Sequence, residues 1–161
     1  MNIKRITQME VELNQVQIGD RITIADSEWK VLDVTDDKVL IWKCTNVEDH
    51  VFNENNKNTY EGSDIQKYLQ DDFKEGIPVD ILEKVTDEGF FLLSLDQVKQ
   101  YMPVPADRTA TDPEGYNTWW WTSTPYVGYG DSVRYISPSG YVYGYYAGNS
   151  GGVAPACWLN L

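Results

Sequence analysis

The chain has 161 residues, which suits one domain of ordinary size. It carries 25 acidic and 13 basic residues, and this net charge of -12 argues against nucleic acid and anionic membranes as partners, because a phosphate-binding face needs clustered Lys and Arg. No apolar run approaches the length of a membrane span, and the stretch from Met1 to Thr7 lacks the apolar core of a secretory signal, so we expect the protein to stay in the cytoplasm.

Residues 18–44 predict an antiparallel meander. Its strands are expected in three segments rich in Val, Ile and Trp, at residues 18–24, 28–34 and 39–44. We expect Trp29 and Trp42 to pack on the faces of this meander. The polar, Asn-rich stretch 46–60 that follows is predicted to be a long surface loop.

Two amphipathic helices are predicted by the same signal, a Ser followed three residues later by a Gln, which together can form a capping box. The first helix begins at Ser63 and the second at Ser94. Their apolar stripes contain Ile65, Tyr68, Leu69 and Phe73 in the first helix and Leu95, Val98, Tyr101 and Met102 in the second. Between the helices, residues 78–85 predict a short helical turn and residues 90–93 a buried strand.

The C-terminal part begins with a proline-rich connection, residues 103–117, which we expect to be irregular. Short segments then alternate with Gly and Pro, at residues 119–123, 132–137, 141–145 and 153–159. The sequence Ser-Pro-Ser-Gly at residues 137–140 predicts a hairpin turn. Alternation along its second arm predicts that Tyr141, Tyr143 and Tyr145 share one face.

Tyrosine rather than charge dominates residues 116–161. Only Asp131 and Arg134 are charged there, whereas eight of the 11 tyrosines lie in this part. The tryptophans of this part are expected to form its frame; they are Trp119, Trp120, Trp121 and Trp158. So many phenols are hard to bury because each hydroxyl needs a partner or water, and Tyr, Ser, Gly and Asn are also the residues of antibody paratopes. We therefore predict a ligand-binding surface that contains Tyr126, Tyr129, Asp131, Tyr135, Tyr141, Tyr143, Tyr145, Tyr146 and Asn149.

Several motifs, in their order along the chain, resemble those of the DUF6273 family of bacterial and phage proteins. The motifs are Glu28-Trp29-Lys30-Val31-Leu32-Asp33, Ser63-Asp64-Ile65-Gln66-Lys67-Tyr68-Leu69, Phe90-Phe91-Leu92-Leu93-Ser94, Trp119-Trp120-Trp121-Thr122-Ser123, a Ser-Gly-Tyr-Val turn and Gly152-Val153-Ala154-Pro155-Ala156-Cys157-Trp158-Leu159. The resemblance covers nearly all of residues 16–161 and implies a C-type-lectin-like fold of the α+β class. It also implies kinship with formylglycine-generating-type enzymes and with proteins that diversity-generating retroelements vary. The variable positions of the latter favour Asn, Tyr, Ser, Asp, Gly and Ala, a composition that residues 126–150 share.

This chain departs from the family pattern at two positions, Thr122 and Ala154, where relatives commonly carry arginines. If those arginines brace the C-terminal part through bidentate hydrogen bonds, this chain must use another brace. If they contact a ligand, the ligand of this chain differs.

Groups that perform catalysis are scarce. The single histidine is His50 and the two cysteines are Cys44 and Cys157, without the spacing of a zinc site or a disulfide framework, so we expect buried thiols and a solvated imidazole. Formylglycine-generating relatives need two cysteines late in the fold, and only Cys157 lies there. The glycine-rich run 143–152 lacks the lysine and the following helix of a phosphate loop. Because acidic residues are abundant, a calcium site stays an open alternative, although no loop has ligands at the spacing of an EF-hand.

These observations predict a single domain over residues 1–161, with residues 1–115 as an acidic scaffold and residues 116–161 as the display part. We expect a non-enzymatic recognition protein without cofactor or metal, whose partner is a protein or carbohydrate on the surface of a cell or particle. One form of this hypothesis is a retroelement-diversified receptor-binding protein that is associated with a phage virion. The alternatives are an assembly protein that forms homo-oligomers through the aromatic patch, and a degenerate formylglycine-generating-type enzyme.

Overall fold

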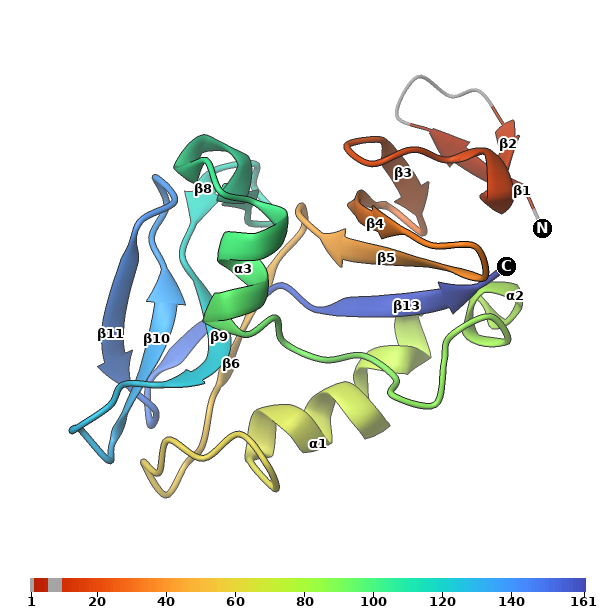
Figure 1. The fold of residues 1–161 in the computed structure, drawn as a ribbon. Helices are drawn as coiled ribbons and strands as arrows, with labels where there is room; N and C mark the ends of the chain where they lie inside the picture. The colour runs from red at the N-terminus through yellow and green to blue at the C-terminus, as the bar shows by residue number, and fades with distance from the viewer. Residues whose placement is uncertain (1, 6–9) are drawn as a thin grey trace.

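The computed structural model describes residues 2–5 and 10–161, with side chains from Glu12 onward. Its two larger sheets occupy opposite ends of the molecule, with α3 (Leu95–Tyr101) between them and α1 (Asp64–Asp71) along one side (Figure 1). Helices combined with mainly antiparallel strands confirm the α+β class, although strands predominate.

The first sheet has six strands in the order β13-β5-β4-β3-β1-β2. Their bounds are Asn2–Arg5 for β1, Glu10–Glu12 for β2, Arg21–Ile24 for β3, Ser27–Val34 for β4, Lys38–Lys43 for β5 and Ala156–Asn160 for β13. The antiparallel pairing of β3, β4 and β5 confirms the predicted meander. Trp29 lies opposite Lys43, and Trp42 lies opposite Lys30, so the two indoles pack on opposite faces, in separate hydrophobic clusters.

The second sheet has five strands in the order β11-β10-β9-β12-β6. Their bounds are Glu48–Val51 for β6, Trp120–Pro125 for β9, Ser132–Ile136 for β10, Val142–Tyr146 for β11 and Ser150–Val153 for β12. The predicted hairpin is confirmed: β10 and β11 run antiparallel in regular register, and Gly140 takes a φ of 93° in the turn between them. Strand β11 forms one outer edge of the sheet.

Both predicted helices begin at the expected serines. The hydroxyl of Ser63 accepts a hydrogen bond from the N–H of Gln66 at the start of α1, and Ser94 forms a full capping box with Gln97 at the start of α3. In α1 the Gln66 side chain accepts instead from the N–H of Gly62, so only half of the box is present. The short turn predicted at 78–85 is helix α2, Val79–Leu82.

Pro155 divides the segment that was predicted as one strand over residues 153–159. Strand β12 ends at Val153 in the five-stranded sheet, and β13 begins at Ala156 in the six-stranded sheet. Proline has no N–H to donate to a ladder, and its carbonyl accepts from the N–H of Lys43 at 2.9 Å. The acidic scaffold and the display part are therefore interleaved in space, because β13 completes the sheet of the scaffold and β6 joins the sheet of the display part.

Three sequence predictions need correction. The loop predicted over residues 46–60 contains β6 and the fully buried Phe52, because the segment pairs with β12 far along the chain. Residues 90–93 are buried but form only an isolated bridge, from Phe91 to Ala156, because the chain leaves β13 after that contact. The connection at 103–117 contains regular pieces: the 3-10 helix η3 and a small sheet of β7 with β8, whose bounds are Pro105–Arg108, Ala110–Thr111 and Asn117–Thr118. Two other 3-10 turns, η1 and η2, span Leu13–Gln15 and Phe73–Gly76.

No helix in the described part of the chain is long and apolar enough to cross a bilayer.

Candidate functional site

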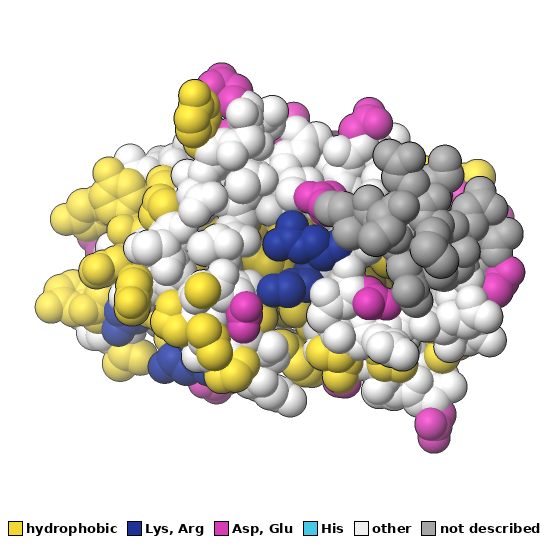
Figure 2. All heavy atoms as spheres, turned by 90° about the horizontal axis from the view of Figure 1, so that it is seen from above, with side chains coloured by type: hydrophobic (Ala, Val, Ile, Leu, Met, Phe, Trp, Pro, Cys, Tyr) yellow, Lys and Arg dark blue, Asp and Glu magenta, His cyan; other side chains and the backbone are white. Residues whose placement is uncertain are grey.

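Hydrophobic and tyrosine side chains gather at the end of the molecule where β10 and β11 lie, as the yellow area on the left of Figure 2 shows. The predicted ring positions are mostly exposed there: Tyr129 by 58%, Tyr141 by 56%, Tyr143 and Tyr146 by 53% and Tyr145 by 43%. Tyr126 and Tyr135 are half-buried. The tyrosines thus lie on the surface of the sheet and do not fill a core.

One group of rings covers a single side of the β10–β11 hairpin. We call it the Tyr135 face; it consists of Trp119, Tyr135, Tyr143 and Tyr145. Tyr135 lies directly opposite Tyr143, with ring centroids 6.0 Å apart, and its ring lies 4.7 Å from Trp119. Tyr145 lies 5.7 Å from Trp119 and 6.4 Å from Tyr135. Burial, followed by the neighbouring phenols Tyr143 and Tyr145, raises the pKa of Tyr135, so this ring stays a neutral hydrogen-bonding group. The prediction that Tyr141, Tyr143 and Tyr145 share one face agrees with this arrangement for Tyr143 and Tyr145, whereas Tyr141 precedes β11 and lies in the turn.

A second group lies on the opposite side of the hairpin. This Tyr126 face consists of Tyr126, Tyr129, Asp131, Gly144 and Tyr146, which line a groove of about 330 Å³ together with Ser132 and Tyr145. The rings of Tyr126 and Tyr129 meet edge to face at 4.7 Å. The guanidinium of Arg134 lies 3.7 Å above the Tyr126 ring, which fixes that ring by a cation–π contact.

Gly144 makes the groove possible. A Cβ at this position would overlap the ring of Tyr126, so only glycine lets the ring lie flat on β11. The groove therefore offers aromatic surface, phenol hydroxyls and one carboxylate. Such a combination suits the apolar face and hydroxyls of a sugar, or a tyrosine-rich protein contact.

Two predicted site residues lie outside both faces. Tyr141 stands in the hairpin turn, where its N–H donates to the hydroxyl of Ser137. Asn149 is half-buried and closes the turn after β11 through its N–H, which donates to the carbonyl of Tyr146 at 3.1 Å. The side-chain amide of Asn149 lies 3.5 Å from the same carbonyl, so it contacts its own turn.

Arg108 braces the C-terminal part of the chain from within the connection that precedes it. Its guanidinium is buried and donates to the carbonyls of Met102 at 2.7 Å, Pro103 at 3.2 Å and Gly140 at 3.1 Å, and so joins the end of α3 to the hairpin turn. Thr122 is buried and its hydroxyl donates to the carbonyl of Arg134 at 2.8 Å, whereas the carbonyl of Ala154 accepts from the indole of Trp42. Both substituted positions are internal, so neither Thr122 nor Ala154 contacts a surface ligand.

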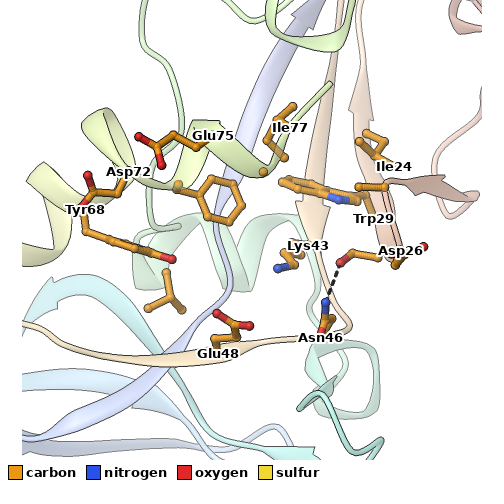
Figure 3. A pocket seen from close by; sticks show the side chains of 15 residues that line it. Ile24, Asp26, Trp29, Lys43, Asn46, Glu48, Tyr68, Asp72, Glu75 and Ile77 are labelled. Carbon is orange, nitrogen blue, oxygen red and sulfur yellow. Dashed lines mark hydrogen bonds between the residues drawn. The ribbon is translucent and has the colours of Figure 1, made fainter. Parts of the chain in front are cut away.

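A second concave site, which the sequence did not predict, lies in the scaffold between the β3–β4 turn, β6 and α1. It is a cavity of about 400 Å³ with walls formed by Trp29, Tyr68 and Phe73 (Figure 3). Lys43 lies between Trp29 and Glu48 in this view, and further carboxylates lie around it: Asp26, Asp72 and Glu75. The cavity has room for a small polar molecule.

Lys43 is electrostatically unusual. Burial lowers its pKa, and the carboxylate of Glu48 opposes that shift. Within the described residues its ammonium has no ion pair or hydrogen bond, and it lies 5.4 Å from the centroid of the Phe73 ring. The indole N–H of Trp29 is also buried without a partner. The lining thus combines one ammonium with four carboxylates, those of Asp26, Glu48, Asp72 and Glu75.

The potential catalytic residues are poorly placed for nucleophilic chemistry. Cys44 and Cys157 are buried free thiols, as predicted, and burial raises the pKa of both, which disfavours the reactive thiolate. The expectation of a solvated His50 is wrong in part, because its ring is half-buried and stacks on Tyr68 at 4.5 Å. Over residues 2–5 and 10–161, no group of three or more His, Cys, Asp or Glu side chains is placed to hold a metal ion.

Fold and surface together define an α+β protein whose most distinctive site is an aromatic, nearly uncharged sheet end. Residues 82–161 match the family model described as a domain of unknown function, DUF6273, and this match supports membership in the family that the motifs indicate. The matched part begins in α2 and contains both tyrosine faces, whereas the motifs at 28–33 and 63–69 lie outside it. No curated protein and no solved structure matches the chain.

Proposed function

We propose that this chain is a non-enzymatic recognition protein that binds its ligand through the Tyr126 face and the Tyr135 face. The observation that supports this proposal best is the exposure of uncharged tyrosine rings on both sides of one hairpin, because large exposed aromatic patches are usually interaction sites. A rigid sheet holds these rings, so binding orders few side chains and costs little conformational entropy.

The ligand class that fits these surfaces is a protein or a carbohydrate on a cell or particle. Rings can stack on the apolar face of a sugar or on aromatic residues of a partner, while Asp131 and the phenols supply hydrogen bonds. The scarcity of charge weakens local electrostatic repulsion at this end of an otherwise acidic molecule.

Within this proposal, the chain adopts a C-type-lectin-like fold and its display part is a target of retroelement diversification in a bacterium or phage. Two features support this form: the exposed tyrosines of residues 126–150 and the buried Trp120 and Trp121 on the neighbouring strand β9. Deep sequencing of the locus in one population tests it. Variation confined to residues 126–150 is the expected result, and a uniform sequence would remove diversification from the proposal.

Binding itself is tested with two arrays, one of printed glycans and one of extracellular protein domains. Tyr129→Ala combined with Tyr146→Ala removes two exposed rings from the groove, and we expect affinity for any bound glycan or domain to fall about tenfold or more. Tyr116→Ala is the matched control, because Tyr116 is 69% exposed but lies before β8, outside both faces. The proposal is wrong if the unmodified protein binds neither array, or if both variants bind equally.

A further inference from the structure

Strand β11 has an unprotected outer edge. Each of the two larger sheets has two outer strands, and three of these four are guarded in the part of the chain that the structure describes. Strand β2 ends in the exposed Glu12, β6 begins with Glu48 and Asp49, and β13 is covered by residues 84–91 through backbone hydrogen bonds. Strand β11 has no charge, no proline and no bulge. Natural sheets rarely leave such an edge free, because its open N–H and C=O groups pair with other strands.

The hydrogen-bond pattern shows which groups of β11 point outward. In an antiparallel pair, alternate residues bond to the neighbouring strand. On β10, the carbonyls of Ser132 and Arg134 bond on the β9 side, to the N–H of Tyr126 and the hydroxyl of Thr122. Their partners on β11, Tyr146 and Gly144, therefore direct their backbone groups away from β10.

Two further hydrogen bonds agree with this alternation of residues that bond toward β10 and residues that bond away from it. The N–H of Ala147 donates to the carbonyl of Asp131, so residues of odd number on β11 bond toward β10. The carbonyl of Tyr146 accepts from Asn149 and so points away from β10. Val142 and Gly144 consequently present their backbone donors and acceptors at the free edge, and Tyr146 presents its N–H there beside a carbonyl that already accepts one hydrogen bond from Asn149.

We propose that β11 pairs antiparallel with β11 of a second copy of this chain, with Gly144 opposite Gly144 across a twofold axis. In this register the outward groups of Gly144 bond each other, and those of Val142 meet those of Tyr146. The two five-stranded sheets then join into one continuous sheet. A second copy fits this edge because β11 is symmetric about Gly144, with a tyrosine on each side, and because the strand carries no charge, so the repulsion between two molecules of net charge -12 is weakest there.

The same register brings Tyr143 of one copy opposite Tyr145 of the other, as a cross-strand pair of aromatic rings. Both rings belong to the Tyr135 face, so pairing joins the Tyr135 faces of the two copies into one surface and leaves the rings open. Dimerisation does not depend on any ligand, and it stands or fails separately from the proposed recognition function.

Sedimentation of the full chain tests the association and its register. For the unmodified protein, the mass measured by sedimentation is expected to be twice the chain mass of 18.4 kDa. Tyr143→Glu with Tyr145→Glu sets carboxylates opposite carboxylates and is expected to give a monomer. Tyr143→Lys with Tyr145→Glu sets an ammonium opposite a carboxylate and is expected to keep the dimer. Near-ultraviolet circular dichroism checks that each variant is folded. Because both rings are exposed, we expect the substitutions to leave the fold intact.

A monomeric unmodified protein at every concentration overturns the proposal. If both double variants are dimers, the two copies meet at another surface. If both are monomers, Tyr143 does not lie opposite Tyr145 of the second copy. Either result also overturns the proposal.

Disulfide trapping gives an independent measurement of register. Directly opposed residues without mutual backbone bonds have Cα atoms about 4.5 Å apart, within the range of a disulfide. Tyr143→Cys with Tyr145→Cys is expected to yield a covalent dimer on oxidation, whereas Tyr141→Cys with Tyr143→Cys places no thiol opposite another. The native thiols do not interfere, because Cys44 and Cys157 are buried. Equal cross-linking of the two double variants contradicts the register.

Discussion

The buried Arg108 offers the most direct test of how the display part is held in place. Its guanidinium donates three hydrogen bonds to backbone carbonyls, of Met102, Pro103 and Gly140, and in the described chain it has no carboxylate partner. Charge-assisted hydrogen bonds contribute about 1.5 kcal/mol each at the lower end of their range. The three bonds together contribute about 4.5 kcal/mol. Replacing arginine by methionine also removes the cost of burying a charge, which offsets part of the lost stability. For Arg108→Met we therefore expect unfolding free energy to fall by about 3 kcal/mol.

Arg108→Lys separates geometry from charge in the same experiment. A lysine keeps the positive charge but cannot span three carbonyls with a rigid fork, so it should recover less than half of the lost stability. Urea unfolding at constant m-value measures both variants. If Arg108→Met lowers the unfolding free energy by less than about 0.5 kcal/mol, or if Arg108→Lys is as stable as the unmodified protein, then the guanidinium does not brace the hairpin.

Three further predictions concern single positions. Gly140→Ala should cost about 2 kcal/mol, because its φ of 93° is strained for alanine and a Cβ would overlap the carbonyl of Pro105. At about 2–4 °C per kcal/mol for a domain of this size, the melting temperature should fall by about 4–8 °C, and an unchanged melting temperature would contradict the close approach. Ser94→Ala removes the cap of α3 and should cost about 1 kcal/mol in urea unfolding, whereas no loss would mean that water replaces the cap. Lys43→Met should raise the melting temperature at pH 7. Below its lowered pKa, Lys43 is charged in the folded protein, and burial of that charge destabilises the fold. This destabilisation fades as the pH rises toward 10.5, the usual lysine pKa, so the rise in melting temperature caused by Lys43→Met should shrink over that range. A rise that does not depend on pH would refute the burial argument.

Local signals predicted the helices and the hairpin well. The serines at 63 and 94 place a capping oxygen and the Gln three residues on within the same turn, so no distant contact is needed to fix the start of either helix. The turn at 137–140 likewise contains its own proline and glycine.

Features that depend on distant partners were not predictable. Strand β6 reads as a polar loop because its pairing residues lie about a hundred positions away, where His50 meets Gly151. The cavity around Lys43 draws its lining from β3–β6, α1 and η2, and its sequence signal is a single lysine at the end of a buried strand. Composition alone located the tyrosine surface, but its division into two faces required the register of β10 with β11.

Gly144 also has a consequence for how the surface can change in evolution. The rings of Tyr143, Tyr145 and Tyr146 end in solvent, so exchanging them alters what the surface touches while the interior stays intact. Gly144 has no such freedom, since any side chain there displaces Tyr126, and Gly151 is held in the same way by Trp119. The sheet thus combines exposed positions that are open to substitution with glycine positions that are closed to it, which lets new binding specificities arise one residue at a time on an unchanged fold.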